Sequence, residues 1–247
     1  MCIRDSNYRH YVAAFQHYTR IVARQIESVL EALYSTPAGK NTIVIVLADH
    51  GDGMGSHRMV TKQVSFYEEM TNVPFIIAGP GIHPRQKPVE DLLTQPTIDL
   101  LPTLCELAGI PVPSSKPGIS LAPFLKGEKQ KRQHPYAASE WHSEYEVTVS
   151  PGRIIRSPRY KYTHYLDGNG EELYDMLKDK GERRNLAHDP KYSKILAEHR
   201  ALLDDYIRRT QDDYRSLKVE ADKRWRSHAP GYPNHEGPCA RDIINRK

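Results

Sequence analysis

The sequence predicts an α/β protein in two parts. A truncated, mostly parallel sheet with flanking helices is expected first, followed by a smaller antiparallel sheet packed by a long helix. Residues 42–48 and 73–78 are continuous apolar runs rich in β-branched residues, the pattern of strands buried on both faces of a parallel sheet. After Pro135 the chain changes to shorter segments separated by turn residues, which is typical of an antiparallel sheet.

Helices are expected on either side of the two apolar runs. From Tyr8 to about Leu33, apolar residues recur with a helical period, and Pro37 and Gly39 end the pattern. The segment Gln95–Leu107 predicts a second helix, with a proline in its first turn and a glycine soon after its end. Residues 111–118 form a loop rich in proline and serine.

The second part contains three expected strands, 136–140, 152–156 and 160–165, the last two joined by a hairpin turn at Ser157–Arg159. Residues 192–214 return to helical spacing, and an irregular tail follows. The expected organisation is therefore an α/β region over residues 7–130, an antiparallel-sheet region over 131–226 and a tail over 227–247.

Composition excludes several classes of protein. The 35 basic and 31 acidic residues give a net charge of only +4, which does not indicate nucleic-acid binding. No apolar run approaches the roughly 20 residues of a membrane span. The three cysteines have neither the number of a disulfide framework nor the spacing of a zinc site.

The segment after the first apolar run carries the most chemistry. Asp49 and His50 follow the expected strand, and a carboxylate beside an imidazole suits a divalent cation. The glycines that come next allow the backbone to approach a small anion. Lys62 offers a compact positive charge, and His57 offers a proton donor with a near-neutral pKa. The alternative is a simple strand-to-loop turn, since two ligands do not close a metal site.

Further along the chain, Trp141 and His142 follow an expected strand, where they form either a wall for a sugar substrate or a cover for the core. Arg153 and Arg156 alternate along a strand and predict a solvated face. Glu68 and Glu69 open a short helix and are expected to bind nothing.

Nine segments carry a family resemblance, in this order along the chain: Asp49–Gly51, Gly55–His57, Lys62, Phe66–Glu69, Val73–Ile77, Asp99–Gly109, Arg159–Tyr162, Glu172–Asp175 and Gly181–Leu186. They resemble the sulfatase family of the alkaline phosphatase superfamily. The resemblance implies a partial alkaline-phosphatase-like fold. It also implies a sulfuric ester hydrolase acting on a sulfated carbohydrate or an aryl sulfate.

The same resemblance implies a role for each matching residue. Asp49 and His50 match adjacent metal ligands, and Lys62 matches the lysine that contacts the sulfate and the leaving oxygen. His57 lies in the loop that borders the substrate. Calcium is the usual ion of the family, and the imidazole ligand leaves room for another divalent metal.

The nucleophile of the family is missing from this sequence. Sulfatases make a formylglycine from the first residue of a Cys/Ser-x-Pro-x-Arg motif, and none of the three cysteines begins one. Because the family carries that motif upstream, the chain is expected to be a carboxy-terminal half that is inactive alone. The rival functions are a phosphodiesterase or phosphonate monoester hydrolase of the same superfamily, and a non-catalytic chain that binds sulfated glycans. The resemblance also implies a secreted or periplasmic protein, although residues 1–6 do not read as a signal peptide.

Overall fold

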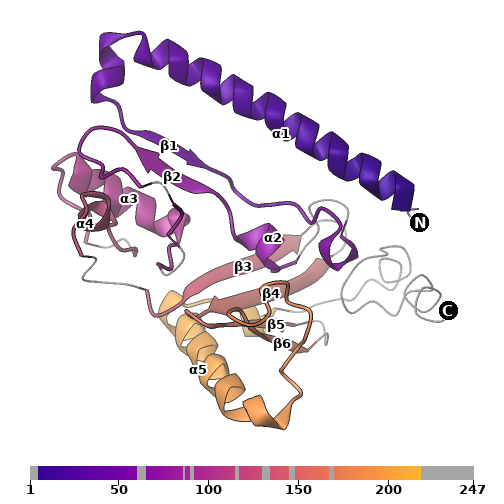
Figure 1. Cartoon of the computed structure of the whole chain (residues 1–247). Helices are drawn as coiled ribbons and strands as arrows, with labels where there is room; N and C mark the ends of the chain where they lie inside the picture. Colours follow the sequence, from indigo (N-terminus) through magenta and orange to yellow (C-terminus); the bar gives the residue numbers. More distant parts are fainter. Residues whose placement is uncertain are drawn as a thin grey trace.

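The computed structural model describes residues 5–59, 65–85, 87–89, 92–114, 117–129, 134–144, 148–166 and 170–217. The first helix is confirmed as α1 (Asp5–Tyr34), which runs along one side of the molecule above the first strands (Figure 1). Near its start, the hydroxyl of Tyr8 donates a hydrogen bond to the carbonyl oxygen of Met54. Most of α1 is exposed, including apolar side chains at Tyr8, Phe15, Tyr18, Ile21, Val22, Ile26, Val29 and Tyr34.

The two apolar runs form strands β1 (Val44–Leu47) and β2 (Phe75–Ala78), but the expected parallel arrangement is wrong for this pair. They pair antiparallel, with Leu47 opposite Phe75. A parallel pair needs a crossover that carries the chain to the opposite end of the sheet. Here residues 48–74 leave and return at the same end, so the second strand runs back along the first.

The expectation that both strands are buried on two faces is also wrong. Leu47 is 43% exposed and Ile76 is 57% exposed. Continuous apolar runs fit a strand that is covered on both sides. In the described part of the chain, β1 and β2 form a two-stranded sheet without further strands on its edges.

Helices α3 (Pro96–Leu107) and α4 (Ala122–Leu125) lie beside this strand pair, and α3 confirms the second expected helix. A buried carboxylate joins them to the connecting loop. Asp99 accepts hydrogen bonds of 2.8 Å from the backbone N–H groups of both Gln95 and Ile119. Its Oδ1 atom also lies 2.7 Å from Nε2 of His134.

The expected antiparallel sheet is confirmed. It contains β3 (Ala137–Glu144), β4 (Thr148–Arg156), β5 (Tyr160–Tyr165) and β6 (Glu171–Asp175), paired in that order. The predicted turn between β4 and β5 is closed by the Ser157 hydroxyl, which donates to the Tyr160 carbonyl oxygen. Four strands with a covered face are enough for independent stability.

Alternation along these strands gives the sheet two different faces. One face is apolar and packs against α5 (Ser193–Thr210), around a core of Tyr136, Ile155, Tyr162, Leu173, Leu186, Leu196 and Leu203. Figure 1 shows α5 on the side of the sheet away from α1. The opposite face carries Ile154, Lys161, Thr163, Tyr165, Glu172 and Tyr174 and meets the segment around α2 (Glu68–Thr71).

None of the helices in the described ranges combines the length and the apolar composition that crossing a bilayer requires. The predicted tail over residues 227–247 lies outside the described residues. The expected domain boundaries stay predictions.

Candidate functional site

Asp49 and His50 follow the end of β1, where the 48–74 connection leaves the strand pair. The Nε2 atom of His50 lies 3.7 Å from Oδ2 of Asp49. The other ring nitrogen, Nδ1, is 2.8 Å from the carbonyl oxygen of Gly51. A carbonyl oxygen only accepts, so Nδ1 carries a proton, and Nε2 faces the carboxylate of Asp49.

The loop after this pair is packed tightly onto α2. The N–H of Gly51 donates to the carbonyl oxygen of Met70 over 2.9 Å. A Cβ atom at Gly51 would lie 1.8 Å from the carbonyl oxygen of Glu69, so only glycine fits. Residues 49–59, here called the metal-site loop after the two metal ligands expected in it, therefore take their position from α2.

His57 is held inside this loop rather than pointing freely to solvent. Its ring stacks face to face on Tyr67, with 3.6 Å between the ring centroids and 2° between the planes. Burial lowers its pKa, although the charge of Glu69 and a hydrogen bond with the Gly181 backbone act in the opposite direction. His57 also adopts a left-handed backbone conformation with φ of 50°. These contacts tie the metal-site loop to the turn that follows β6.

Residues 65–71, here called the anchor segment, dock the loop onto the polar face of the sheet. Phe66 packs with Ile154 and Tyr165. It fills the space over Gly152, where a Cβ atom would lie 2.4 Å from its ring. Tyr67 and Met70 join a second buried cluster with Met59, Tyr174 and Met176.

Charged groups are buried beneath the anchor segment. The Lys161 side chain on β5 is 1% exposed, and its Nζ lies 2.9 Å from Oε1 of Glu182 and 3.1 Å from Oε1 of Glu68. Glu182 also accepts a 2.6 Å hydrogen bond from the backbone N–H of Glu68. Glu68, for which no binding role was expected, forms an ion pair with this buried lysine.

The cluster contains one more carboxylate, Glu172 on β6. Burial, and to a smaller extent the charge of Glu182, raises the pKa of Glu172 to about 7. Lys161 and hydrogen bonds with Tyr67 and Tyr174 act in the opposite direction. Sequence reasoning missed this cluster. Its signal is the alternation of polar residues along two paired strands, where Lys161 lies opposite Tyr174 and Thr163 opposite Glu172.

The expected solvated face at Arg153 is wrong. Arg153 is 4% exposed and forms a two-pronged ion pair with Asp212, over 2.7 and 2.9 Å. It also donates to the carbonyl oxygen of Trp141 and lies over the ring of Tyr214. Burial with a carboxylate partner satisfies its fixed fork of donors.

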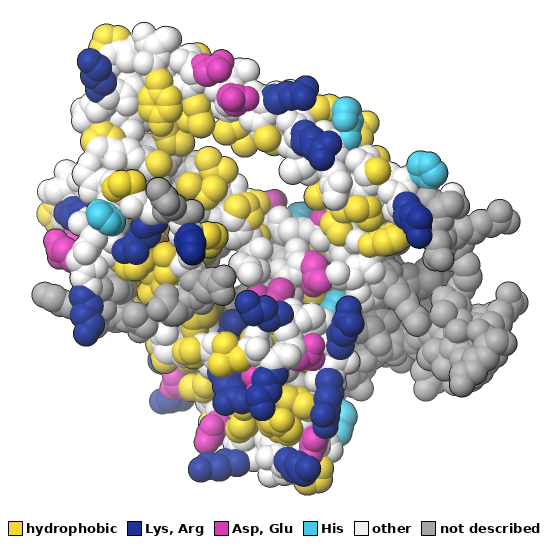
Figure 2. Space-filling model, viewed as in Figure 1, with side chains coloured by type: hydrophobic (Ala, Val, Ile, Leu, Met, Phe, Trp, Pro, Cys, Tyr) yellow, Lys and Arg dark blue, Asp and Glu magenta, His cyan; other side chains and the backbone are white. Residues whose placement is uncertain are grey.

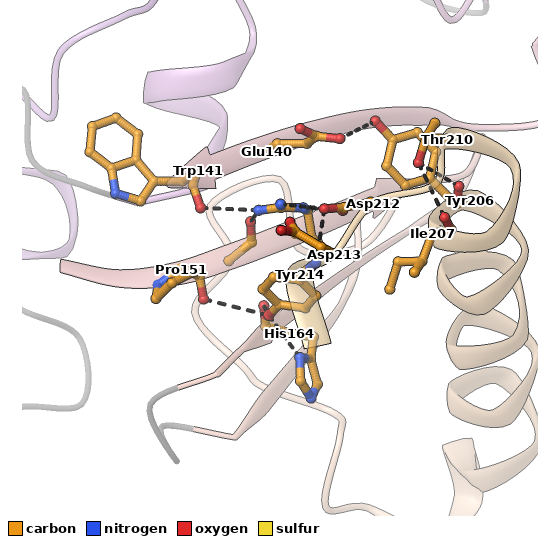
Figure 3. Close-up of polar contacts among 12 residues, drawn as sticks. Glu140, Trp141, Pro151, His164, Tyr206, Ile207, Thr210, Asp212, Asp213 and Tyr214 are labelled. Atoms are coloured by element: carbon orange, nitrogen blue, oxygen red, sulfur yellow. Dashed lines mark hydrogen bonds and ion pairs between the residues drawn. The ribbon is translucent and has the colours of Figure 1, made fainter. Parts of the chain in front are cut away.

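Trp141 contributes to this junction through its backbone, while its indole ring points away from it (Figure 3). The ring packs against the cluster of Phe66, Ile154 and Tyr165. His142 follows it in β3, but its side chain lies outside the described part of the chain. The structure therefore favours a core cover over a sugar wall at Trp141.

The donor set at Asp49 and His50 suits part of a metal shell. Within the described ranges, no group of three or more His, Cys, Asp or Glu side chains converges. Calcium takes roughly six to eight oxygen ligands, so further donors must come from elsewhere. Lys62, the expected sulfate contact, lies outside the described residues.

Comparisons with known proteins address the same region. The carboxy-terminal family model of N-sulphoglucosamine sulphohydrolase matches residues 55–209. A Delta 4,5-hexuronate-2-O-sulfatase of Bacteroides thetaiotaomicron is 74% identical over 243 residues, which are 98% of this chain and 50% of that protein.

Solved structures give the same result. A 2-O GAG sulfatase superposes with a TM-score of 0.89 at 74% identity, covering 97% of this chain and 52% of that chain. A phosphonate monoester hydrolase from Silicibacter pomeroyi superposes with a TM-score of 0.66 at 28% identity, covering 78% of this chain and 40% of that chain. The chain spans about half the length of its 74% identical relative. It belongs to the sulfatase family and corresponds to the carboxy-terminal portion of its members.

Proposed function

We propose that the chain forms one half of a sulfuric ester hydrolase that removes sulfate from a carbohydrate. The Asp49–His50 pair carries this proposal, because it presents a carboxylate and an imidazole nitrogen side by side at the end of a strand. The 74% identity to a hexuronate-2-O-sulfatase supports a 2-O-sulfated uronic acid as the substrate. A secreted or periplasmic location follows from the same kinship.

Each site residue receives one task in this proposal. Asp49 and His50 would hold a divalent ion, which is calcium in most members of the family, and the ion would supply positive charge at the sulfate. Lys62 neutralises the charge that develops on the ester oxygens. The stacked ring of His57 keeps the metal-site loop in place, and its contacts with Tyr67 and Gly181 favour that task over proton donation.

We assign the remaining parts of the active site to the half of the Bacteroides relative that this chain does not match. These are the formylglycine, which supplies the nucleophile, and the further acidic metal ligands. Among the 247 residues, no Cys/Ser-x-Pro-x-Arg motif offers the nucleophile within this chain. The chain alone then binds metal weakly and turns over no substrate.

A second candidate is hydrolysis of phosphonate monoesters or phosphodiesters. The superposition on a phosphonate monoester hydrolase favours it, because the same fold hosts that chemistry. A third is binding of sulfated glycans without turnover, which would follow if no nucleophile joins the site.

One experiment separates the three. The unmatched half of the Bacteroides relative is placed before this chain to make a joined protein. Its kcat/KM is then measured on a 2-O-sulfated unsaturated hexuronate and on an aryl phosphonate monoester. We expect the sulfate ester to be preferred by at least about 100-fold, because charge and shape of the site must match one transition state. Faster phosphonate hydrolysis would favour the second candidate, and binding of the sulfated sugar without turnover the third.

A further inference from the structure

The charged groups beneath the anchor segment form a bridge between the sheet and α2. Glu182 uses both carboxylate oxygens: Oε1 faces Nζ of Lys161 at 2.9 Å, and Oε2 accepts the N–H of Glu68 at 2.6 Å. Lys161 reaches α2 as well, through Glu68 at 3.1 Å and the Thr71 hydroxyl at 3.4 Å. Both residues hold the same short helix at its first turn.

Forming this bridge costs free energy, because it buries two charges and requires an unfavourable backbone conformation. Lys161 and Glu182 are each 1% exposed at the side chain, and charges taken out of water need close partners. Glu182 also has a φ of 49°, in the left-handed region that residues other than glycine rarely adopt. A cluster that only filled space would be served as well by apolar side chains.

The helix held in this way carries the metal-site loop. The Met70 carbonyl oxygen accepts the N–H of Gly51, next to His50, over 2.9 Å. The Glu69 carbonyl lies where a side chain at Gly51 would be. On the other side of the loop, His57 stacks on Tyr67, the residue that immediately precedes α2.

We propose that Glu182 and Lys161 are positioning residues of the candidate active site, which fix α2 and through it the Asp49–His50 pair. That Asp49 and His50 are metal ligands rests on the proposed function. The contacts by which Glu182 and Lys161 hold α2 and the loop in place do not depend on it. Neither residue touches the substrate. They act by presenting the two ligands in one orientation from a rigid sheet.

The test uses hydrogen exchange in the chain as it stands. Lys161→Met with Glu182→Leu removes both charges and both contacts while keeping similar bulk. Glu182→Gln keeps an acceptor for the Glu68 N–H and serves as the conservative variant. Arg200→Gln is the matched control, because it breaks the 2.7 Å ion pair with Glu171 on the side of α5.

We expect exchange over residues 49–59 and 66–71 to rise about tenfold or more in the double variant, since local opening governs amide exchange. Exchange over 152–156 and 196–203 should stay within about threefold of the wild type. Arg200→Gln should resemble the wild type in the loop. Glu182→Gln keeps the acceptor for the Glu68 N–H but removes the charge nearest Lys161, so its exchange in the loop should lie between those of the wild type and the double variant. An unchanged loop in the double variant would overturn the proposal, and so would equal acceleration in the sheet core, which indicates general stabilisation.

Activity of the joined protein gives a second readout. The double variant should lose about tenfold or more in kcat/KM, Glu182→Gln should lose less, and Arg200→Gln should keep the wild-type value. If the unmodified joined protein has no activity, the proposed function fails, while hydrogen exchange still decides the positioning role.

Discussion

At the scale of single residues, Glu172 shows how burial changes a titration. It lies on the polar face of the sheet with a pKa of about 7, raised by burial and by its neighbour Glu182. The folded protein therefore keeps its proton at a pH where the unfolded chain, with an ordinary value of 4.5, has lost it. Stability from this group is fully present below the unfolded pKa and is lost as the pH rises toward 7.

The pH dependence of unfolding tests this residue. Relative to Glu172→Gln, the wild-type free energy of unfolding should fall by about 3 kcal/mol between roughly pH 4.5 and 7, and stay level above that. Urea unfolding of both proteins across this range measures the difference, in which the titrations of the buried histidines cancel. Parallel curves for the two proteins would show that Glu172 does not titrate in this window.

Lys62 is the residue whose substitution should affect catalysis without affecting the fold. In the joined protein, Lys62→Ala should lower kcat/KM roughly 10²–10³-fold, the scale for one preorganised charge that stabilises the transition state. Arginine should restore little, because its planar fork aims its donors differently. Steady-state kinetics with metal content measured alongside decide it, and near-wild-type rates with metal bound would remove Lys62 from the site.

The Asp49–His50 pair was predicted to bind metal because a carboxylate and an imidazole, both metal-binding side chains, follow an apolar run, and the metal site stays a prediction. Arg153 was expected on a solvated face and Glu68 was expected to bind nothing, since charged residues on strands and short helices are mostly exposed. Their partners, Asp212 and Lys161, lie 59 and 93 residues away, a separation at which local pattern carries no information.

At the scale of elements, the predicted helices and antiparallel strands were found within a few residues. The antiparallel pairing of β1 and β2 contradicts the parallel arrangement that was expected, because an apolar run does not specify the direction of its neighbouring strand. The run does predict that something covers the strand. Leu47 and Ile76 remain exposed, and so does the apolar side of α1.

Figure 2 shows hydrophobic side chains on the side of α1 that faces the first strands, with an open gap between helix and sheet. Large apolar faces of this kind mark an interaction surface. The unmatched half of the Bacteroides relative is the partner that we expect there. The match to that relative includes 98% of this chain but only 50% of the relative.

Substitutions on the two sides of α1 test this expectation. The unmatched half, expressed as a separate chain, should bind this chain. Val29→Asp should raise the dissociation constant at least about tenfold, because it places a charge in the apolar contact. Val29 is 67% exposed, so the fold of this chain should survive. Ala13→Asp, on the opposite side of the helix, is the control. Equal binding by both variants, in titration calorimetry, would place the partner elsewhere.

At the scale of the whole molecule, the two sheets have different roles. The four-stranded sheet with α5 is a stable platform with its own core. The strand pair β1–β2 presents the two proposed metal ligands at one end, and the anchor segment joins the strand pair to the four-stranded sheet (Figure 1). A platform of this kind can hold half of a site in place before the other half arrives.

Sulfate release by the joined protein, with aspartate or asparagine at position 49, tests the central claim most directly. We expect this chain alone to release no sulfate above a blank, and the joined protein to release it with a bound divalent ion. Asp49→Asn should lower kcat by roughly 10²–10³-fold with loss of metal, because a ligand charge is removed from the site. Asp204→Asn on α5 should change nothing. Equal sulfate release from the Asp49→Asn and unmodified proteins, or turnover by this chain alone, would contradict the account.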